Sequence, residues 1–418
     1  MSVRVTTLKN GLRVATDHIG TVESATVGVW CDVGTRDEPA PVNGVAHLLE
    51  HMVFKGTRRR SASAIAEEIE NVGGHMNAYT AREQTAYYAR VLKGDLALAV
   101  DLIADILQHS LFDPQELRRE RAVVLQEIGQ ANDTPDDIIF DHFQAAAFPR
   151  QGVGRPVLGR ASVVKRMKRD TVREFLAGHY APGNLVLAAA GNVQHDRLVR
   201  LAEEKFDRLP KAAKQPRDTA QYRGGEHREH RALDQIHLVL GFEGLGHHDK
   251  DFYPLQVMST VLGGGMSSRL FQEVREKRGL VYSIYSFASS MRDGGVFGIY
   301  AGTGEKEVRE LLPVVAEEVV KVADKVTEEE VARARAQLKA GTLMALESTS
   351  SRCEQLAQQL IVFGRPIPTS EIVARIEAVD AGAVTRVMRR MLATPLTMAA
   401  LGPIKRVDDY AAVAARLN

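Results

Sequence analysis

The sequence is poor in cysteine and in long hydrophobic runs. Its 418 residues include two cysteines and one tryptophan, and aromatic residues make up only 6%. Cys31 and Cys353 lie far apart in the sequence, and neither belongs to a pair with metal-binding spacing. They are therefore predicted to be buried, reduced thiols in a reducing compartment. No apolar run approaches the ~20 residues of a membrane span, so no transmembrane segment is expected.

The sequence also has no excess of positive or negative charge. Lysine and arginine total 54, aspartate and glutamate total 53, and the formal net charge is +1. Bulk electrostatics therefore implies neither a nucleic-acid partner nor a membrane partner. The first residues, 1–5, contain neither the apolar stretch of a secretory signal nor an amphipathic, arginine-rich presequence. We expect a bacterial cytoplasmic protein, with the mitochondrial matrix as the alternative for a processed one.

The overall composition is that of a folded protein. Hydrophobic residues make up 44% and charged residues 26%, which is ordinary for a globular chain and argues against disorder. A chain of this length is long for a single core, so two or more domains are expected.

The segment HLLEH, from His47 to His51, is the strongest chemical signal. Two histidines four residues apart on a helix lie on the same face, and Glu50 shares that face. Two imidazoles can bind one divalent cation while a neighbouring carboxylate acts on water. This spacing is the inverted zincin signature. The alternative is a helix that happens to carry three polar residues.

A second predicted helix, which follows Asp113, offers candidates for a third metal ligand. Asp113 is typical of an N-cap and Pro114 of a first helical residue. Glu120 and Glu127 are two turns apart, so they share one stripe of this helix. With these residues, the sequence resembles the pitrilysin-type metallopeptidases, in which a downstream glutamate follows H-x-x-E-H. The resemblance is to the short, two-domain branch that contains the mitochondrial processing peptidase beta subunit and its bacterial relatives.

The resemblance implies a role for each residue of this group. His47, His51 and Glu127 would bind one zinc ion per chain, Glu50 would be the general base, and Glu120 a supporting carboxylate. The same ligands also accept Mn²⁺ or Co²⁺.

The activity implied by the resemblance is zinc-dependent hydrolysis of extended peptides or presequence-like segments, inside a chamber enclosed by two chains. A homodimer is the first expectation, and a heterodimer with an inactive homologue is the alternative. The competing function is a non-catalytic structural or partner subunit of the same family, which the intact motif disfavours.

Two strand-like segments, 75–80 and 85–92, follow the motif. An extended segment beside a metal site can pair with a peptide through backbone hydrogen bonds. The resemblance implies this substrate-binding role for Asn77 and Ala78. The alternative is an internal strand in which Asn77 closes a turn, and the neighbouring His75 is expected to be a surface histidine.

Asp137 and Asp141 lie one turn apart on a helix expected to follow Pro135. The resemblance implies that they recognise an arginine near the cleavage point, because carboxylates bind the guanidinium group bidentately. The alternative is an acidic helix N-terminus favoured by the helix dipole.

The second half of the sequence repeats the first at an offset of about 205–215 residues, which indicates duplication. The metal residues do not recur, since 255–261 contains neither histidine nor glutamate and Gly341 lies near the position equivalent to Glu127. Thr327 and Glu330 form a predicted capping box.

From the duplication we expect an α+β fold of two tandem homologous domains, each a mostly antiparallel sheet packed with helices. The expected divisions are a zinc peptidase domain over 1–210, a polar linker over 211–225 and a catalytically silent domain over 226–418.

The silent half has its own motif. The glycines at 263–265 lack the Lys-Ser/Thr of a P-loop, so nucleotide binding is not expected. Arg275 and Tyr282 are seven residues apart, as are an arginine and a tyrosine that hold the substrate carbonyl in the resembling family. There, the silent domain facing the zinc belongs to a partner chain. The alternative is a surface arginine and a core tyrosine.

Overall fold

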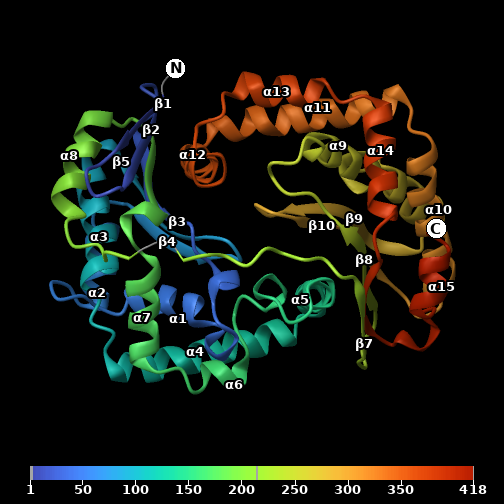
Figure 1. Cartoon of the computed structure of the whole chain (residues 1–418), viewed down its shortest axis with the longest axis horizontal. Helices are drawn as coiled ribbons and strands as arrows, with labels where there is room; N and C mark the ends of the chain where they lie inside the picture. The colour runs from blue at the N-terminus through green and yellow to red at the C-terminus, as the bar shows by residue number, and fades with distance from the viewer. Residues whose placement is uncertain (1–2, 213–214, 418) are drawn as a thin grey trace. The chain divides into compact units, whose positions relative to one another are not determined.

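The chain forms two compact units, each built around one β-sheet (Figure 1). The structure is a computed structural model, and it describes residues 3–212 and 215–417. Each unit is assembled from three separate stretches of chain. The first contains Met1–Gly129, Arg155–Asp218 and Met344–Ile367, and the second contains Gln130–Gly154, Thr219–Leu343 and Pro368–Asn418.

The sheet of the first unit has the strand order β1-β2-β6-β3-β5-β4. Strands β2 and β6 are parallel, and the other neighbouring pairs are antiparallel. Strand β4 therefore lies at one edge, where it pairs with β5 alone among the described strands. The strands are β1 Val3–Thr7, β2 Arg13–His18, β3 Ser24–Cys31, β4 His75–Thr80, β5 Thr85–Leu92 and β6 Leu185–Gly191.

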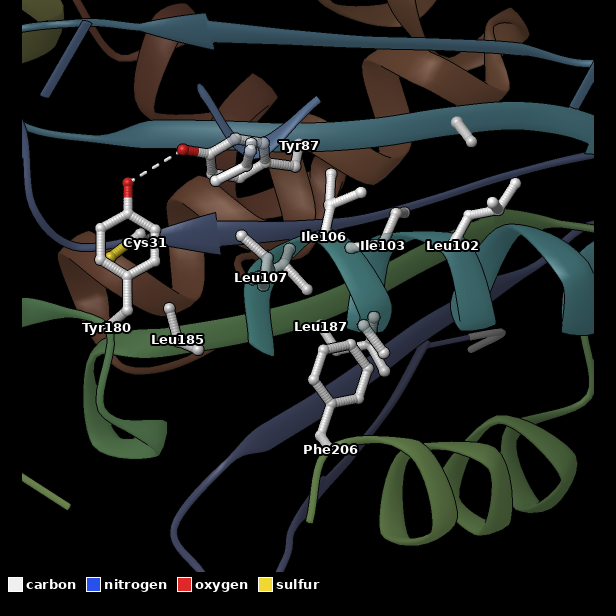
Figure 2. Close-up of a cluster of buried hydrophobic side chains, with 14 of the residues drawn as sticks. Cys31, Tyr87, Leu102, Ile103, Ile106, Leu107, Tyr180, Leu185, Leu187 and Phe206 are labelled. Atoms are coloured by element: carbon white, nitrogen blue, oxygen red, sulfur yellow. Dashed lines mark hydrogen bonds between the residues drawn. The ribbon is translucent and has the colours of Figure 1, made fainter. Parts of the chain in front are cut away.

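Helices cover both faces of this sheet. Helix α3, Leu96–His109, packs against β3 and β5, and its side chains at 102, 103, 106 and 107 belong to the same hydrophobic core as Leu187 of β6 (Figure 2). Helix α12, Thr349–Phe363, packs against β6, β3 and β2 and buries the alternate residues of β6. The remaining helices are α1 Val45–Val53, α2 Ala62–Glu70, α4 Pro114–Asn132, α6 Ala161–Val164, α7 Arg169–His179 and α8 His195–Lys205.

Both cysteines are buried in the first unit and neither forms a disulfide. Cys31 ends β3 beside Tyr87 and Tyr180, whose hydroxyl oxygens lie 3.1 Å apart (Figure 2). The Cys353 thiol donates to the carbonyl of Ala188, 3.3 Å away. The predicted burial of both thiols is confirmed.

The second sheet has the order β7-β11-β8-β10-β9. Strands β7 and β11 are parallel, and the others are antiparallel. This order matches β2-β6-β3-β5-β4 of the first sheet, strand for strand, so the predicted α+β fold with two homologous halves is confirmed. The strands are β7 Gly225–His230, β8 Ile236–Glu243, β9 Val281–Ser290, β10 Gly295–Thr303 and β11 Thr397–Gly402.

The helices of the second unit include one from the first half of the sequence. They are α5 Pro135–Ala147, α9 Phe252–Gly263, α10 Val308–Asp324, α11 Glu328–Met344, α13 Thr369–Glu377, α14 Ala381–Leu392 and α15 Tyr410–Ala415, with a π-helical turn over Phe271–Glu276. No helix among the described residues is long and apolar enough to cross a membrane.

Helices α5 and α12 are exchanged between the two halves of the sequence. Helix α5 packs against β11, β8 and β7 of the second sheet, while α12 packs against the equivalent strands of the first. Their starts, Pro135 and Thr349, are separated by an offset within the repeat interval of about 205–215 residues. The compact units therefore differ from the linear division at 210 and 226, because each helix buries its apolar face on the sheet of the other half. Of the expected linker, residues 213 and 214 lie outside the described residues, and Gly225 already belongs to β7.

Candidate metal centre

Helix α1 presents its polar residues on one face. Leu48, Leu49 and Met52 are buried in the core of the first unit. His47 and His51 lie on the opposite face, because a helix turns once every 3.6 residues. The helix begins after Gly44, whose φ of +98° is a conformation that glycine adopts without strain.

A buried carboxylate holds the start of this helix. Glu38 accepts hydrogen bonds from the backbone N–H of Gly44 and of Ala46, each at 2.8 Å, and from the Asn43 side chain at 2.8 Å. Burial raises the pKa of Glu38 to about 7, against the lowering effect of these hydrogen bonds. Glu38 thus satisfies N–H groups that the first turn of a helix leaves without intrahelical partners.

Helix α4 supplies the carboxylates. The Asp113 side chain accepts the N–H groups of Gln115 and Glu116, at 2.7 and 3.1 Å, so the predicted N-cap is confirmed. Glu120 is buried and Glu127 is half-buried, and both project from the same stripe of the helix.

Three potential ligand atoms converge between α1 and α4. Nε2 of His47 lies 3.7 Å from Oε2 of Glu127, and Nε2 of His51 lies 3.5 Å from the same oxygen. All three ligand atoms lie within 4.8 Å of one another. Ligand atoms around a tetrahedral zinc ion, at bond lengths of 2.0–2.2 Å, are about 3.4 Å apart. The spacing and the donor types therefore fit one divalent cation.

The two histidines differ in their supporting contacts. Nδ1 of His51 lies 3.0 Å from Oε2 of Glu120, and the other oxygen of that carboxylate pairs with Lys55 at 2.8 Å. Such an outer carboxylate fixes the orientation of a metal-binding imidazole. Nδ1 of His47 is buried and has no hydrogen-bond partner among the described residues. Burial and the proximity of His51 lower the pKa of His47 to about 4, which leaves the imidazole neutral.

Glu50 lies beside this cluster, and a residue of the sheet holds its carboxylate in place. Its Oε2 accepts a hydrogen bond from Oγ1 of Thr80, 2.5 Å away on β4. Burial raises the pKa of Glu50, while the Thr80 hydrogen bond and His51 act in the opposite direction. A carboxylate with a raised pKa is suited to accept and return a proton.

The residues expected to bind peptide lie on the same edge strand as Thr80. Asn77 is exposed and Ala78 is half-buried, and they are opposite Tyr88 and Tyr87 of β5. Strand β4 also contacts α1. The segment is therefore an edge strand and not an internal one, and His75 is exposed, as predicted.

The other predicted residues lie in the second unit. On α5, Asp137 is exposed and Asp141 is half-buried. The guanidinium of Arg275 lies 5.0 Å from the ring centre of Tyr282. Tyr282 is 78% exposed, so the alternative of a core tyrosine is wrong. The sequence places this pair in one motif, and the structure brings the two side chains into contact.

Three supporting residues were missed from the sequence. Glu38 lies in the loop before α1 and holds the start of that helix, Lys55 lies in the turn after α1 and pairs with Glu120, and Thr80 lies on β4. The sequence pattern alone did not single out these contacts. A threonine on the strand after the motif was the one available signal, because its hydroxyl can donate to a nearby carboxylate.

Two family models match the chain. Residues 13–161 match Insulinase (Peptidase family M16), and residues 166–338 match the Peptidase M16 inactive domain. An uncharacterized zinc protease of Streptomyces coelicolor is 42% identical over 97% of this chain and 90% of its own length. A probable mitochondrial-processing peptidase subunit beta of Arabidopsis thaliana is 41% identical over 97% of this chain and 80% of its own length.

The fold is shared with solved structures. A protease from Helicobacter pylori superposes with a TM-score of 0.88 at 23% identity, over 96% of this chain and 99% of that one. The two matched models lie one after the other along the chain, and the similarity to the curated relatives spans nearly the whole chain. The protein therefore belongs to peptidase family M16.

Proposed function

We propose that the protein is a zinc-dependent endopeptidase that hydrolyses extended peptides. The proposal rests on the convergence of His47, His51 and Glu127 with a half-buried carboxylate, Glu50, beside them. The zinc-protease names of the relatives support the same class of activity.

The chemistry of the chain's own residues centres on Glu50. A zinc ion held by His47, His51 and Glu127 would act as a Lewis acid and lower the pKa of water from 15.7 to ~7. Glu50 accepts the proton of the attacking water and returns it to the leaving amine. Thr80 holds one oxygen of Glu50, which limits the directions in which the other oxygen can take up a proton.

The peptide would bind along β4. This strand has a free edge within the described sheet, and backbone pairing there would present an extended peptide beside Glu50 without selecting its sequence. Asn77 and Ala78 would supply that pairing. Asp137 and Asp141 would favour arginine near the cleavage point through carboxylate–guanidinium pairing.

Arg275 and Tyr282 would stabilise the developing oxyanion. Both are hydrogen-bond donors, and the stacked guanidinium restrains an otherwise exposed ring. We assign this pair to the site of a second copy of the chain, so that the active enzyme is a homodimer with composite sites.

Peptide hydrolysis by the Glu50→Gln variant tests the activity. A fluorogenic peptide should be cleaved by the wild type, and cleavage should stop with a chelator and return with zinc. Glu50→Gln should lose hydrolysis while it keeps its zinc, whereas Glu70→Gln, an exposed control on α2, should behave as wild type. Activity retained in Glu50→Gln would remove Glu50 from the mechanism. An inactive wild type that is loaded with zinc would favour a non-catalytic partner subunit.

A mixing experiment tests the composite site. Glu50→Gln and Arg275→Ala chains are each expected to form weakly active or inactive dimers. A mixed dimer would contain one site with both residues intact, so activity should return when the two variants exchange subunits. No return in verified mixed dimers would place Arg275 in the same chain as the Glu50 it assists. Size-exclusion chromatography of the purified chain gives the oligomeric state.

A further inference from the structure

A second cluster of ligand-type residues lies in the second unit. His142 comes from α5, and His227 and Glu229 come from β7. One ligand atom from each lies within 4.8 Å of the others. His227 and Glu229 are two residues apart on a strand, so their side chains point to the same side of the sheet. Helix α5 packs against this strand and brings His142 to them.

The donor spacing matches that of the first cluster. Oε2 of Glu229 lies 3.4 Å from Nε2 of His142 and 3.5 Å from Nε2 of His227. The corresponding distances around Glu127 are 3.7 and 3.5 Å. Both pairs of distances agree with the separation of about 3.4 Å expected between the ligands of a tetrahedral zinc ion.

Each of the two imidazoles has a buried nitrogen atom that lies close to the same carboxylate oxygen. Nε2 of His142 and Nε2 of His227 are both buried without a well-formed hydrogen bond among the described residues. Buried polar atoms of this kind call for a partner, and an ion is one that both could share. The rings are stacked, with centroids 3.9 Å apart and an angle of 12° between the planes. Two imidazolium cations would repel at this separation, whereas two neutral rings each offer a lone pair.

Arg231 leaves one oxygen of the carboxylate for a ligand. Its Nε donates to Oε1 of Glu229 at 2.6 Å, and its guanidinium also donates to the carbonyl of Asn132, just before α5. Oε2 is thus directed to the histidines. This arrangement resembles that of Glu120, where Lys55 holds one oxygen and His51 faces the other.

We propose that His142, His227 and Glu229 form a second zinc site, which clamps helix α5 to strand β7. Solvent supplies the fourth ligand, since the three side chains are 22–34% exposed. The lone pairs of two nearly parallel rings do not converge on one point. Around a tetrahedral ion they must meet at a wide angle, so the stacked rings splay apart when the ion binds. The role of this site is structural, because the ion would link α5 to β7. It is separate from the hydrolytic centre proposed above.

Metal stoichiometry tests the second site independently of peptidase activity. Protein stripped with a chelator and titrated with Zn²⁺ should bind two equivalents per chain. His227→Ala should bind one, and His51→Ala/Glu127→Ala should bind one. The combination of all three substitutions should bind none. His230→Ala, on the other face of β7, is the matched control and should bind two. A wild type that binds one equivalent, lost in His51→Ala/Glu127→Ala and kept in His227→Ala, overturns the proposal.

Cobalt absorption and thermal unfolding provide a second test of this site. This test uses more than one variant, so it does not fail if a single variant does not fold. In the His51→Ala/Glu127→Ala background, Co²⁺ should give the intense visible absorption of a tetrahedral site, and Zn²⁺ should raise the Tm. Adding Glu229→Gln should abolish both effects while the far-UV circular dichroism stays unchanged. Cobalt absorption and a Tm increase that survive Glu229→Gln and His142→Ala would also overturn the proposal.

Discussion

Oε2 of Glu120 lies 3.0 Å from Nδ1 of His51, on the side of the imidazole ring opposite the atom that faces Glu127. The carboxylate is buried, and its second oxygen pairs with Lys55. Glu120 thus fixes the ring that would bind the metal and leaves Nε2 as the ligand atom.

Replacing Glu120 should weaken metal binding without abolishing it. Loss of an outer carboxylate typically costs 10–100-fold in metal affinity, so we expect Glu120→Gln to bind Zn²⁺ about 10–100-fold more weakly. Competition with a chromophoric chelator measures this change. Glu116→Gln, a partly exposed substitution on the same helix, should leave the affinity within twofold of wild type. Equal affinities for Glu120→Gln and wild type would exclude the supporting role.

The hydrogen bond from Thr80 to Glu50 should affect turnover rather than metal binding. Thr80→Val keeps the shape of the side chain but removes the hydroxyl that orients Glu50. We expect kcat to fall about tenfold, in line with the loss of a hydrogen bond to a charged group worth about 1.5 kcal/mol. Zinc content should stay at the wild-type level. Thr80→Ser restores the hydroxyl and should recover most of the activity, whereas a low kcat in Thr80→Ser would mean that packing, not hydrogen bonding, explains the effect.

The parts of the site that could be predicted are those encoded by helical spacing. His47 and His51 meet because they are four residues apart on α1, and Asp113 caps α4 because its short carboxylate reaches the first free N–H groups. The convergence of α1 with α4 was inferred by resemblance, because no periodicity states which two helices pack together.

The exchange of α5 and α12 could not be read from the sequence. Each helix has an apolar face, such as Ile139 and Phe143 on α5, and this pattern indicates burial but not the sheet that provides it. The same reasoning explains why the cluster of His142, His227 and Glu229 was not anticipated, since it exists only because α5 packs on β7.

The predicted capping box at the start of α11 gives a pH-dependent prediction. Glu330 Oε2 accepts the Thr327 N–H at 2.8 Å, and Thr327 accepts the Glu330 N–H at 3.2 Å, which confirms the motif. Arg269 also donates to both oxygens of Glu330, at 2.6 and 2.9 Å. The Arg269 hydrogen bond, opposed by partial burial, is the main reason that the pKa of Glu330 falls to about 2.

A lowered folded-state pKa stabilises the fold above the unfolded pKa, and this stabilisation is lost as the pH falls toward 2. Glu330→Gln should therefore reduce the free energy of unfolding at pH 7 by about 1–2 kcal/mol after allowance for solvent screening. The difference from wild type should shrink toward pH 2. Urea unfolding at several pH values measures it, with the exposed neighbour Glu329→Gln as control. A difference that is constant with pH would show that the ionised carboxylate is not its source.

Glu38 should give the opposite pH dependence. Burial raises its pKa from 4.5 to about 7 in the folded state. The stabilisation from the protonated form is then fully present below pH 4.5 and is lost as the pH rises through about 7. Relative to Glu38→Gln, which does not titrate, the wild type should lose about 2–3 kcal/mol of unfolding free energy between pH 5 and pH 8.

The measurement requires metal-free protein, because zinc binding adds its own pH dependence. Unfolding of wild type and Glu38→Gln in the presence of a chelator should therefore give curves that diverge as the pH changes. Glu38→Ala leaves the N–H groups of Gly44 and Ala46 without an acceptor, so it should lower stability at every pH by about 1–3 kcal/mol. It should also weaken zinc binding, because α1 carries two of the proposed ligands. Parallel pH profiles for wild type and Glu38→Gln would mean that Glu38 stays ionised while it caps α1.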